Sequence, residues 1–202
     1  MIDLPDWPAP NGASPKVQDF GGFLDPATGG EVQRLNRLGN RYSVTISLPR
    51  LENQKEGRIW VNRLVKGQKE GVRIEYPLLD FDPGAPNRSD GSPIVVDGAG
   101  QAGINLAVMN CVPNYAFLEG QPVSLEIDGQ HFFDFIAAPA IVASNGKVTL
   151  TLTQMLRKPP TTGSVLHVSR PMIEGFVRGN EVSWELALDR TIGLSFEIWE
   201  RR

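Results

Sequence analysis

The chain has 202 residues, of which 41% are hydrophobic and 21% charged, and its formal net charge is −3. This composition is typical of a globular protein of one or two domains. It excludes a membrane-spanning helix, because no window approaches ~18 consecutive apolar residues. It also excludes an internal disulfide, since Cys111 is the single cysteine. The start lacks a basic region followed by an apolar stretch, so we expect no signal peptide.

Glycine and proline punctuate the chain. The 21 glycines and 16 prolines are scattered between short apolar runs, and together they make ~18% of residues against a usual ~12%. This pattern is typical of a protein rich in β-strands and turns. Residues 1–16 contain four prolines and Trp7, which predicts an extended N-terminal arm. We expect Trp7 to dock on the body or on a neighbouring subunit, because its apolar area is costly to expose.

The first half of the chain predicts strands and one helix. Strands are expected over 17–23, 31–36 and 71–77, and the alternation from 42 to 48 predicts one face made by Tyr42, Val44, Ile46 and Leu48. The segment 51–66 is the one convincing helix, with Trp60, Val61, Leu64 and Val65 on one stripe. Gly67 is the expected stop.

The character of the sequence changes at a polar linker over 80–93. Beyond it, Asp-Gly at 128–129 and Asn-Gly at 145–146 predict hairpins, because such pairs between apolar runs favour tight turns. Residues 157–163 form a second linker. Strands are then expected over 165–168, 173–177, 182–188 and 194–199.

The segment 98–103 matches the dinucleotide motif G-x-G-x-x-G. That motif requires a helix after its third glycine, because the helix amino terminus holds the pyrophosphate. Here residues 104–108 alternate like a strand, and Pro113 lies where the helix would continue. We therefore interpret the segment as a glycine-rich turn between two strands and expect no nucleotide cofactor.

Catalytic and metal motifs are weak. His131, His167 and Cys111 could be imagined as a metal site, but their spacings match no known ligand pattern. The neighbours of Cys111 are apolar, which predicts a buried, inert thiol. Carboxylate pairs such as Glu126 with Asp128 or Asp134 can always be found among 23 acids. We expect no catalytic residue, no metal and no cofactor.

Six segments in order resemble the distal tail proteins of long-tailed, siphovirus-like bacteriophages, prophages and gene transfer agents. They are 4–8 (LPDWP), 34–41 (RLNRLGNR), the helix near 51–66, 96–103 (VDGAGQAG), 118–124 (LEGQPVS) and 155–160 (MLRKPP). The chain then ends with one strand that contains Trp184 and another that contains Phe196. The resemblance covers most of the chain, and it rests on the order of these segments.

The resemblance implies a structural virion protein and a fold that is mainly β. The expected body, 17–85 with 164–202, is a tail-tube-like split β-barrel or sandwich flanked by helix 51–66. Residues 86–163 would be an inserted peripheral β domain, after the N-terminal arm 1–16. The implied function is a ring, usually a hexamer, at the virion tail tip between tail tube and tip hub or baseplate.

The expected partners are further copies of the chain, the tail tube protein and the tail-tip hub protein. DNA would pass through the lumen without specific binding, and no membrane is involved. Synthesis would take place in the bacterial host cytoplasm. We expect residues 1–16 and the basic segment 34–41 to contact neighbours, with Trp7, Arg34, Arg37 and Arg41 as interface residues.

Two other functions stay open. A carbohydrate- or receptor-binding tail module is possible if the aromatic residues of 131–135 are exposed and stack on a sugar. An enzyme, such as a hydrolase of cell-wall polymer, has no paired motif in its favour.

Overall fold

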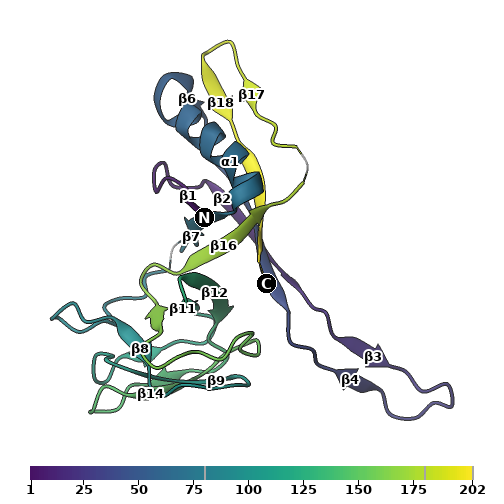
Figure 1. The fold of residues 1–202 in the computed structure, drawn as a ribbon, viewed down its shortest axis with the longest axis vertical. Helices are drawn as coiled ribbons and strands as arrows, with labels where there is room; N and C mark the ends of the chain where they lie inside the picture. Colours follow the sequence, from purple (N-terminus) through teal and green to yellow (C-terminus); the bar gives the residue numbers. More distant parts are fainter. Residues whose placement is uncertain (80, 180, 202) are drawn as a thin grey trace.

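The computed structural model describes residues 1–79, 81–179 and 181–201, and it has a mainly β fold with several sheets (Figure 1). One α-helix occurs in these residues, and none of their sheets closes into a barrel. The prediction of a mainly β protein with one helix is therefore confirmed. No helix in the described part of the chain is long and apolar enough to cross a membrane.

The first of two large sheets has six strands and carries α1 on one side (Figure 1). Its strands, in order across the sheet, are β1 (Ile2–Asp3), β7 (Val72–Glu75), β16 (Met172–Val177), β19 (Ser195–Glu200), β5 (Arg41–Ser47) and β2 (Gly12–Gln18). Only β1 and β7 run parallel; the other neighbours are antiparallel. Strands from both ends of the chain thus share one sheet.

Residues 1–16, expected as an extended arm, contribute strands to this sheet near both of their ends. Strand β1 pairs along one edge with β7, and β2 pairs along the other edge with β5. Pro15 lies opposite Val44, at an outer strand where a missing N–H is tolerated. The segment is therefore paired with its own chain, because its backbone groups complete both edges of the sheet.

The core of the first sheet follows the predicted alternation. Tyr42, Val44 and Ile46 of β5 are buried, and so is Leu48 just after it. In the C-terminal strand the side chains of Phe196 and Ile198 are buried as well. Trp60 and Leu64 of α1 pack into the same cluster. The face predicted over 42–48 is confirmed.

The helix differs from the predicted 51–66. Leu51–Glu52 forms strand β6, Asn53–Gly57 forms a π-helical turn, and α1 runs from Arg58 to Glu70. Gly67 does not stop the helix; it is buried, and a Cβ there would overlap Val72 Cγ1. The helix ends at Gly71, which has a φ of +77°. Glycine at 67 therefore lets the helix approach β7 closely.

The second large sheet is built from the middle of the chain. Its strands, in order, are β12 (Gln130–Phe135), β11 (Pro122–Ile127), β15 (Val165–His167), β8 (Ile94–Val96), β9 (Asn105–Met109) and β14 (Val148–Thr151). A short ribbon of β10 (Ala116–Phe117) and β13 (Ala140–Ile141) lies beside it. All its strand pairs are antiparallel.

Turn chemistry explains much of this sheet. Asp128 and Gly129 both have positive φ and join β11 to β12, as predicted. The glycine-rich segment 98–103 joins β8 to β9, which confirms a turn between strands rather than a nucleotide loop. Gly146 also turns the chain with positive φ, but β13 and β14 pair with β10 and β9 instead of with each other.

Two hydrophobic clusters accompany the two sheets. The second cluster includes Leu166, because β15 pairs with β11 and β8. The predicted body at 164–202 includes this strand, but the structure places it in the second sheet, which therefore reaches past residue 163. Phe133, inside the predicted insert, belongs to the first cluster. Asp80, the first residue of the predicted linker, lies outside the described residues.

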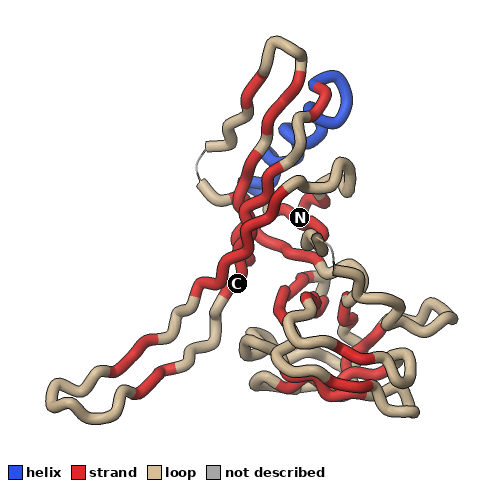
Figure 2. The backbone as a smooth tube through the Cα atoms, turned by 180° about the vertical axis from the view of Figure 1, so that it is seen from behind, coloured by secondary structure: helices blue, strands red, loops and turns tan. Residues whose placement is uncertain are grey.

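Two ribbons extend from the first sheet in opposite directions (Figure 2). One contains β3 (Gly22–Leu24) and β4 (Gln33–Leu35), and the other contains β17 (Glu185–Leu186) and β18 (Thr191–Gly193), which also pairs with β6. The strand predicted over 182–188 is reduced to two residues. The chain turns at Ala187, whose carbonyl accepts from Arg190 N at 3.0 Å.

Candidate functional site

The predicted interface residues lie in two places. Trp7 is in the connection between β1 and β2; its side chain is 70% exposed, and its carbonyl accepts a hydrogen bond from Trp60 Nε1 at 3.2 Å. Arg34 lies in β4, Arg37 lies in the connection from β4 to β5, and Arg41 begins β5. The three arginines therefore share the returning half of one ribbon, and Trp7 belongs to another loop.

We call residues 19–40 the projecting hairpin. It continues the β2–β5 pair away from the body, and β3 and β4 pair along it, with Phe23 opposite Arg34 (Figures 1 and 2). Large apolar side chains are exposed along its length: Phe20, Phe23, Leu24, Val32, Leu35 and Leu38. Phe23 is 67% exposed. A soluble monomer rarely exposes so many large apolar groups on one segment, so the hairpin has the character of an interaction surface.

Contacts at the base hold the projecting hairpin in place. Asn40 donates to Gln154 Oε1 at 2.8 Å, which ties the base to the loop after β14. Arg34 forms an ion pair with Asp19, and the Arg41 guanidinium lies 5.4 Å from the centre of the Phe20 ring. Arg34 and Arg41 thus stabilise the hairpin, since their partners Asp19 and Phe20 both belong to it.

The ribbon at the opposite end also exposes apolar side chains. Trp184, Leu186 and Leu188 are exposed there. A shallow groove between the helix and this ribbon is lined by Arg58, Val61, Val65, Trp184 and Leu186, among others. The chain therefore has two different apolar surfaces at opposite ends of the first sheet (Figure 2).

A buried polar seam joins the two large sheets. The Arg157 guanidinium donates two hydrogen bonds to Glu200, at 2.7 and 2.9 Å. Glu200 also accepts from the backbone N–H groups of Tyr42 and Phe133, each at 2.8 Å. The Tyr42 hydroxyl donates to Asp134 Oδ1 at 2.8 Å. These bonds connect β5 and β19 with β12 and the loop after β14.

Burial dominates the electrostatics of the seam. It raises the pKa of Asp134 to about 6, against the hydrogen bonds from Phe135, Tyr42 and Gln154 that favour the charged carboxylate. Burial also raises the pKa of Tyr42, and the neighbouring Asp134 carboxylate adds to this shift. The hydroxyl of Tyr42 therefore stays protonated and remains a donor.

Aromatic rings fill the space next to the seam. The Phe133 ring centre lies 5.2 Å from that of Tyr42 and 4.5 Å from that of Tyr76. Phe133 is 1% exposed, and Phe132 lies under Arg157. Phe132 and Phe135 are half-buried. The aromatic residues of 131–135 are therefore not the fully exposed sugar platform that was expected, because this strand packs between the two cores.

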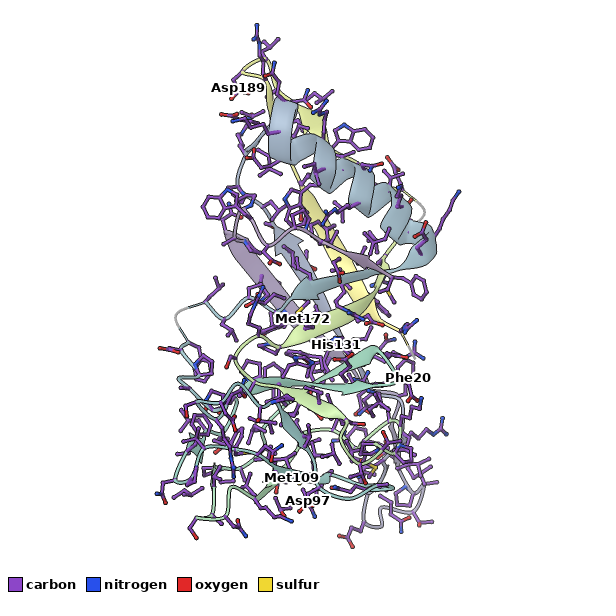
Figure 3. The ribbon with its side chains drawn as sticks, turned by 60° about the vertical axis from the view of Figure 1, so that its left-hand side comes forward. Phe20, Asp97, Met109, His131, Met172 and Asp189 are labelled. Atoms are coloured by element: carbon purple, nitrogen blue, oxygen red, sulfur yellow. The ribbon has the colours of Figure 1, made fainter. Side chains whose placement is uncertain are left out.

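A second polar group lies on the second sheet. Glu126 of β11, His131 of β12 and His167 of β15 come together, with one potential ligand atom of each within 4.8 Å of the others. His167 Nε2 is 2.9 Å from Glu126 Oε2, and His131 Nε2 is 3.8 Å from the same oxygen. Figure 3 shows His131 at the level where the first sheet meets the second, close to Met172.

Burial and the nearby Arg73 charge lower the pKa of His131 to about 4, so this imidazole is neutral at neutral pH. The hydrogen bond to His167 lowers the pKa of Glu126. Sequence spacing alone missed this group because its members come from three strands. Cys111, considered with the histidines above, is a buried thiol outside the group, and burial raises its pKa to about 11.

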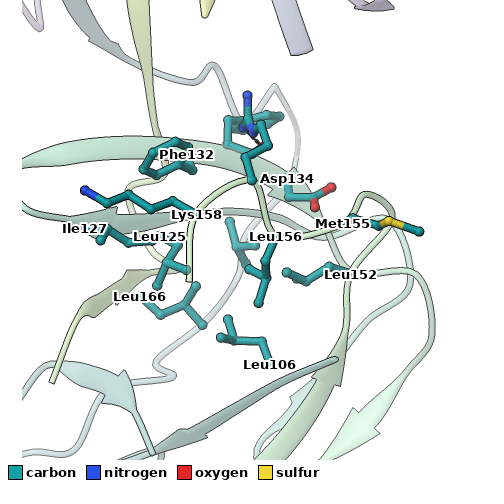
Figure 4. Close-up of a pocket in the computed structure, with 13 residues that line it drawn as sticks. Leu106, Leu125, Ile127, Phe132, Asp134, Leu152, Met155, Leu156, Lys158 and Leu166 are labelled. Atoms are coloured by element: carbon teal, nitrogen blue, oxygen red, sulfur yellow. Dashed lines mark hydrogen bonds between the residues drawn. The ribbon is translucent and has the colours of Figure 1, made fainter. Parts of the chain in front are cut away.

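An apolar pocket opens into the second core (Figure 4). Its apolar lining includes Leu106, Leu125, Leu152, Leu156 and Leu166. The charged lining groups already have partners: Asp134 with Tyr42, Arg157 with Glu200, and Lys158 with Asp128 at 2.6 Å. The pocket therefore lacks the convergent polar groups that orient a small molecule.

No protein-family model and no curated protein matches this chain.

Proposed function

We propose that the chain is a structural subunit that assembles with copies of itself into a ring at the distal end of a phage tail, with six subunits as the family resemblance implies. The observation that carries this proposal is the projecting hairpin with its exposed apolar side chains. Burying one large apolar side chain contributes roughly 1.5–3 kcal/mol, so several on one hairpin can drive association.

The two apolar surfaces suit a closed ring. A ring requires a heterologous interface, in which one surface of a subunit meets a different surface of the next. The projecting hairpin and the surface of Trp184, Leu186 and Leu188 differ and lie at opposite ends of the molecule. We infer that each subunit places its hairpin on its neighbour.

The proposed body is a tail-tube-like split barrel formed by the first sheet and α1. The sheet is open within one chain, so in the ring its edge strands would continue into neighbouring subunits. The second sheet would be the peripheral inserted domain. The proposed partners are the tail tube protein on one side of the ring and the tail-tip hub on the other. DNA would pass through the lumen of the ring without specific binding. The proposed role of the chain is structural rather than enzymatic.

Assembly of the purified full chain tests the proposal. Light scattering should report a closed oligomer, and negative-stain images should show a ring with a central hole. The triple variant Phe23→Ser, Leu24→Ser, Leu35→Ser should remain folded and monomeric. The matched control is the double variant Leu118→Ser, Ile141→Ser. It changes exposed apolar residues that lie beside the second sheet, and it should still assemble.

A monomeric wild-type chain at high protein concentration would contradict the proposal. A carbohydrate- or receptor-binding module is the alternative function. Burial of Phe133 and His131 removes part of the aromatic surface on which it relied. Glycan binding by a monomeric chain would favour this alternative over the ring.

A further inference from the structure

We propose that Glu126, His131 and His167 form a zinc-binding site on the second sheet, with the fourth coordination position open to water. Zinc prefers imidazole nitrogen and carboxylate oxygen, and sites with three protein ligands commonly keep one position for water. The site is independent of the ring proposed above, because its ligands belong to neither exposed apolar surface.

The ligand atoms are close to the required geometry. Tetrahedral zinc with bonds of about 2.0–2.2 Å places its ligand atoms roughly 3.4 Å apart. Here the three atoms lie within 4.8 Å of one another, and two of the separations are 2.9 and 3.8 Å. His167 and Glu126 are each about one-third exposed, at 31% and 33% of the side chain. Small side-chain rotations of these two residues would complete the site, since solvent borders them.

His131 is already oriented as a ligand. It is 4% exposed, and its ring cannot turn freely inside the core. Ser124 Oγ lies 3.5 Å from His131 Nδ1 and is fixed by accepting Met172 N–H at 2.8 Å. When Nδ1 carries the proton and faces Ser124, the Nε2 lone pair faces Glu126. Such a partner for the second ring nitrogen is characteristic of histidine ligands to metals.

The charged groups beside the site are largely paired. Arg73 of the first sheet acts on His131 and opposes a further positive charge there. Its repulsion is reduced because it pairs with Glu174 at 2.7 Å and lies 4.0 Å from Asp3. The Glu126 carboxylate attracts a bound divalent ion directly.

Zinc binding at this site requires a rearrangement of the ring protons of the two histidines. Histidine binds zinc as the neutral imidazole, so both rings donate a nitrogen lone pair to the metal. The hydrogen bond between His167 Nε2 and Glu126 Oε2 is replaced by two bonds to the metal, and the His167 ring proton moves to Nδ1. No oxidant or reductant takes part, because zinc does not change its oxidation state.

The metal would connect three strands at the junction of the two sheets. Glu126, His131 and His167 come from β11, β12 and β15, and His131 N–H also donates to Glu174 of β16 at 3.4 Å. Zinc bound here would therefore hold β12 and β15 in place on either side of β11.

Calorimetric titration of the full chain, without a histidine tag and after removal of metal with a chelator, tests the proposal. The probe is Zn²⁺ alone. The expected result is one Zn²⁺ per chain at micromolar or tighter affinity, with a higher Tm in its presence. His167→Ala and Glu126→Gln should each weaken binding on the order of 100-fold, because the binding free energy is divided among few ligands. Glu119→Gln, an exposed carboxylate on the same sheet's margin, is the control and should bind as wild type.

The variants change partly exposed side chains, and their Tm in chelator shows that they are folded. Co²⁺ supplies a second measurement, because a four-coordinate site gives strong visible absorption that His167→Ala should abolish. Absence of binding at millimolar Zn²⁺, or binding that both variants leave unchanged, would overturn the proposal. Either result is separable from the ring proposal, which is read from particle mass and shape.

Discussion

Arg157 and Glu200 form a two-bond ion pair across the junction of the two sheets, at 2.7 and 2.9 Å. Only 10% of the Arg157 side chain and 1% of the Glu200 side chain are exposed. Replacing Arg157 with Met leaves a buried carboxylate without its counter-charge. We expect Arg157→Met to lower the free energy of unfolding by about 3–5 kcal/mol, measured by urea denaturation.

Arg170 provides the matched control for this substitution. It also pairs with a carboxylate, Glu75, at 2.6 Å, but its side chain is 61% exposed. Water screens such a pair, so Arg170→Met should cost at most about 1 kcal/mol. Equal costs for the two variants would show that the Arg157 pair does not stabilise the junction.

The buried carboxyl of Asp134 should make stability depend on pH. Its folded pKa of about 6 lies above the ordinary value of 3.8, so the folded chain binds the proton more tightly than the unfolded chain. Its contribution is therefore greatest below about pH 4 and is lost as pH rises through 6. The stability of the wild type relative to Asp134→Asn should fall by roughly 3 kcal/mol over this range and stay constant above it.

Asp90 supplies a control of opposite sign for the pH experiment. It is exposed, and the backbone N–H of Ser92 donates to it at 2.9 Å and lowers its pKa. The stability of the wild type relative to Asp90→Asn should therefore rise with pH through the acid range. If the stability of the wild type relative to Asp134→Asn also rose with pH, the hydrogen bonds to Asp134 would outweigh the effect of its burial.

Gly175 permits close contact between two central strands. A Cβ on this residue would overlap the carbonyl of Trp199 in β19. Backbone atoms must move to admit it, so Gly175→Ala should lower the free energy of unfolding by about 3 kcal/mol. Gly22→Ala, where nothing lies within 4 Å of the new Cβ, should change it by less than about 0.5 kcal/mol. Thermal unfolding of the two variants side by side distinguishes a packing effect from a general effect of alanine.

Local sequence signals predicted the parts of the fold that depend on local physics. The alternation from Tyr42 to Leu48 identified the buried face of β5, since alternate side chains of a strand point the same way. Asp128-Gly129 identified the β11–β12 turn, because both residues accept positive φ. The alternating pattern after Gly103 predicted a strand where a nucleotide loop needs a helix, and β9 is found there.

Features that depend on distant contacts were missed. Gly67 looked like a helix stop, and only its approach to Val72 explains a glycine inside the helix. The proline-rich start looked unpaired, because nothing local reveals that β7 and β5 accept it as an edge. The Asn-Gly signal at 145–146 correctly predicted a turn, but the strands on its two sides do not pair with each other. Strand β13 pairs with β10, and β14 pairs with β9.

The candidate sites also contain some features that the local sequence predicted and others that depend on distant contacts. Arg34, Arg37 and Arg41 were selected by their spacing, and they do lie on one ribbon, yet two of them pair with Asp19 and Phe20 within it. Exposure of Phe23 and Leu35 could not be read from their identity, since apolar residues in a predicted strand are expected to be buried. Glu126, His131 and His167 meet only when β15 joins β11.

The order of strands in the first sheet has a consequence for how the chain folds during translation. The two central strands, β16 and β19, are the last of the six to leave the ribosome, whereas β2, β5 and β7 emerge early and have no central partner until then. The second sheet uses a nearly continuous stretch of sequence and can form while synthesis is still under way. The nascent polypeptide should therefore acquire its middle module first, and the hairpin with its apolar side chains gains a rigid base only after β19 is added.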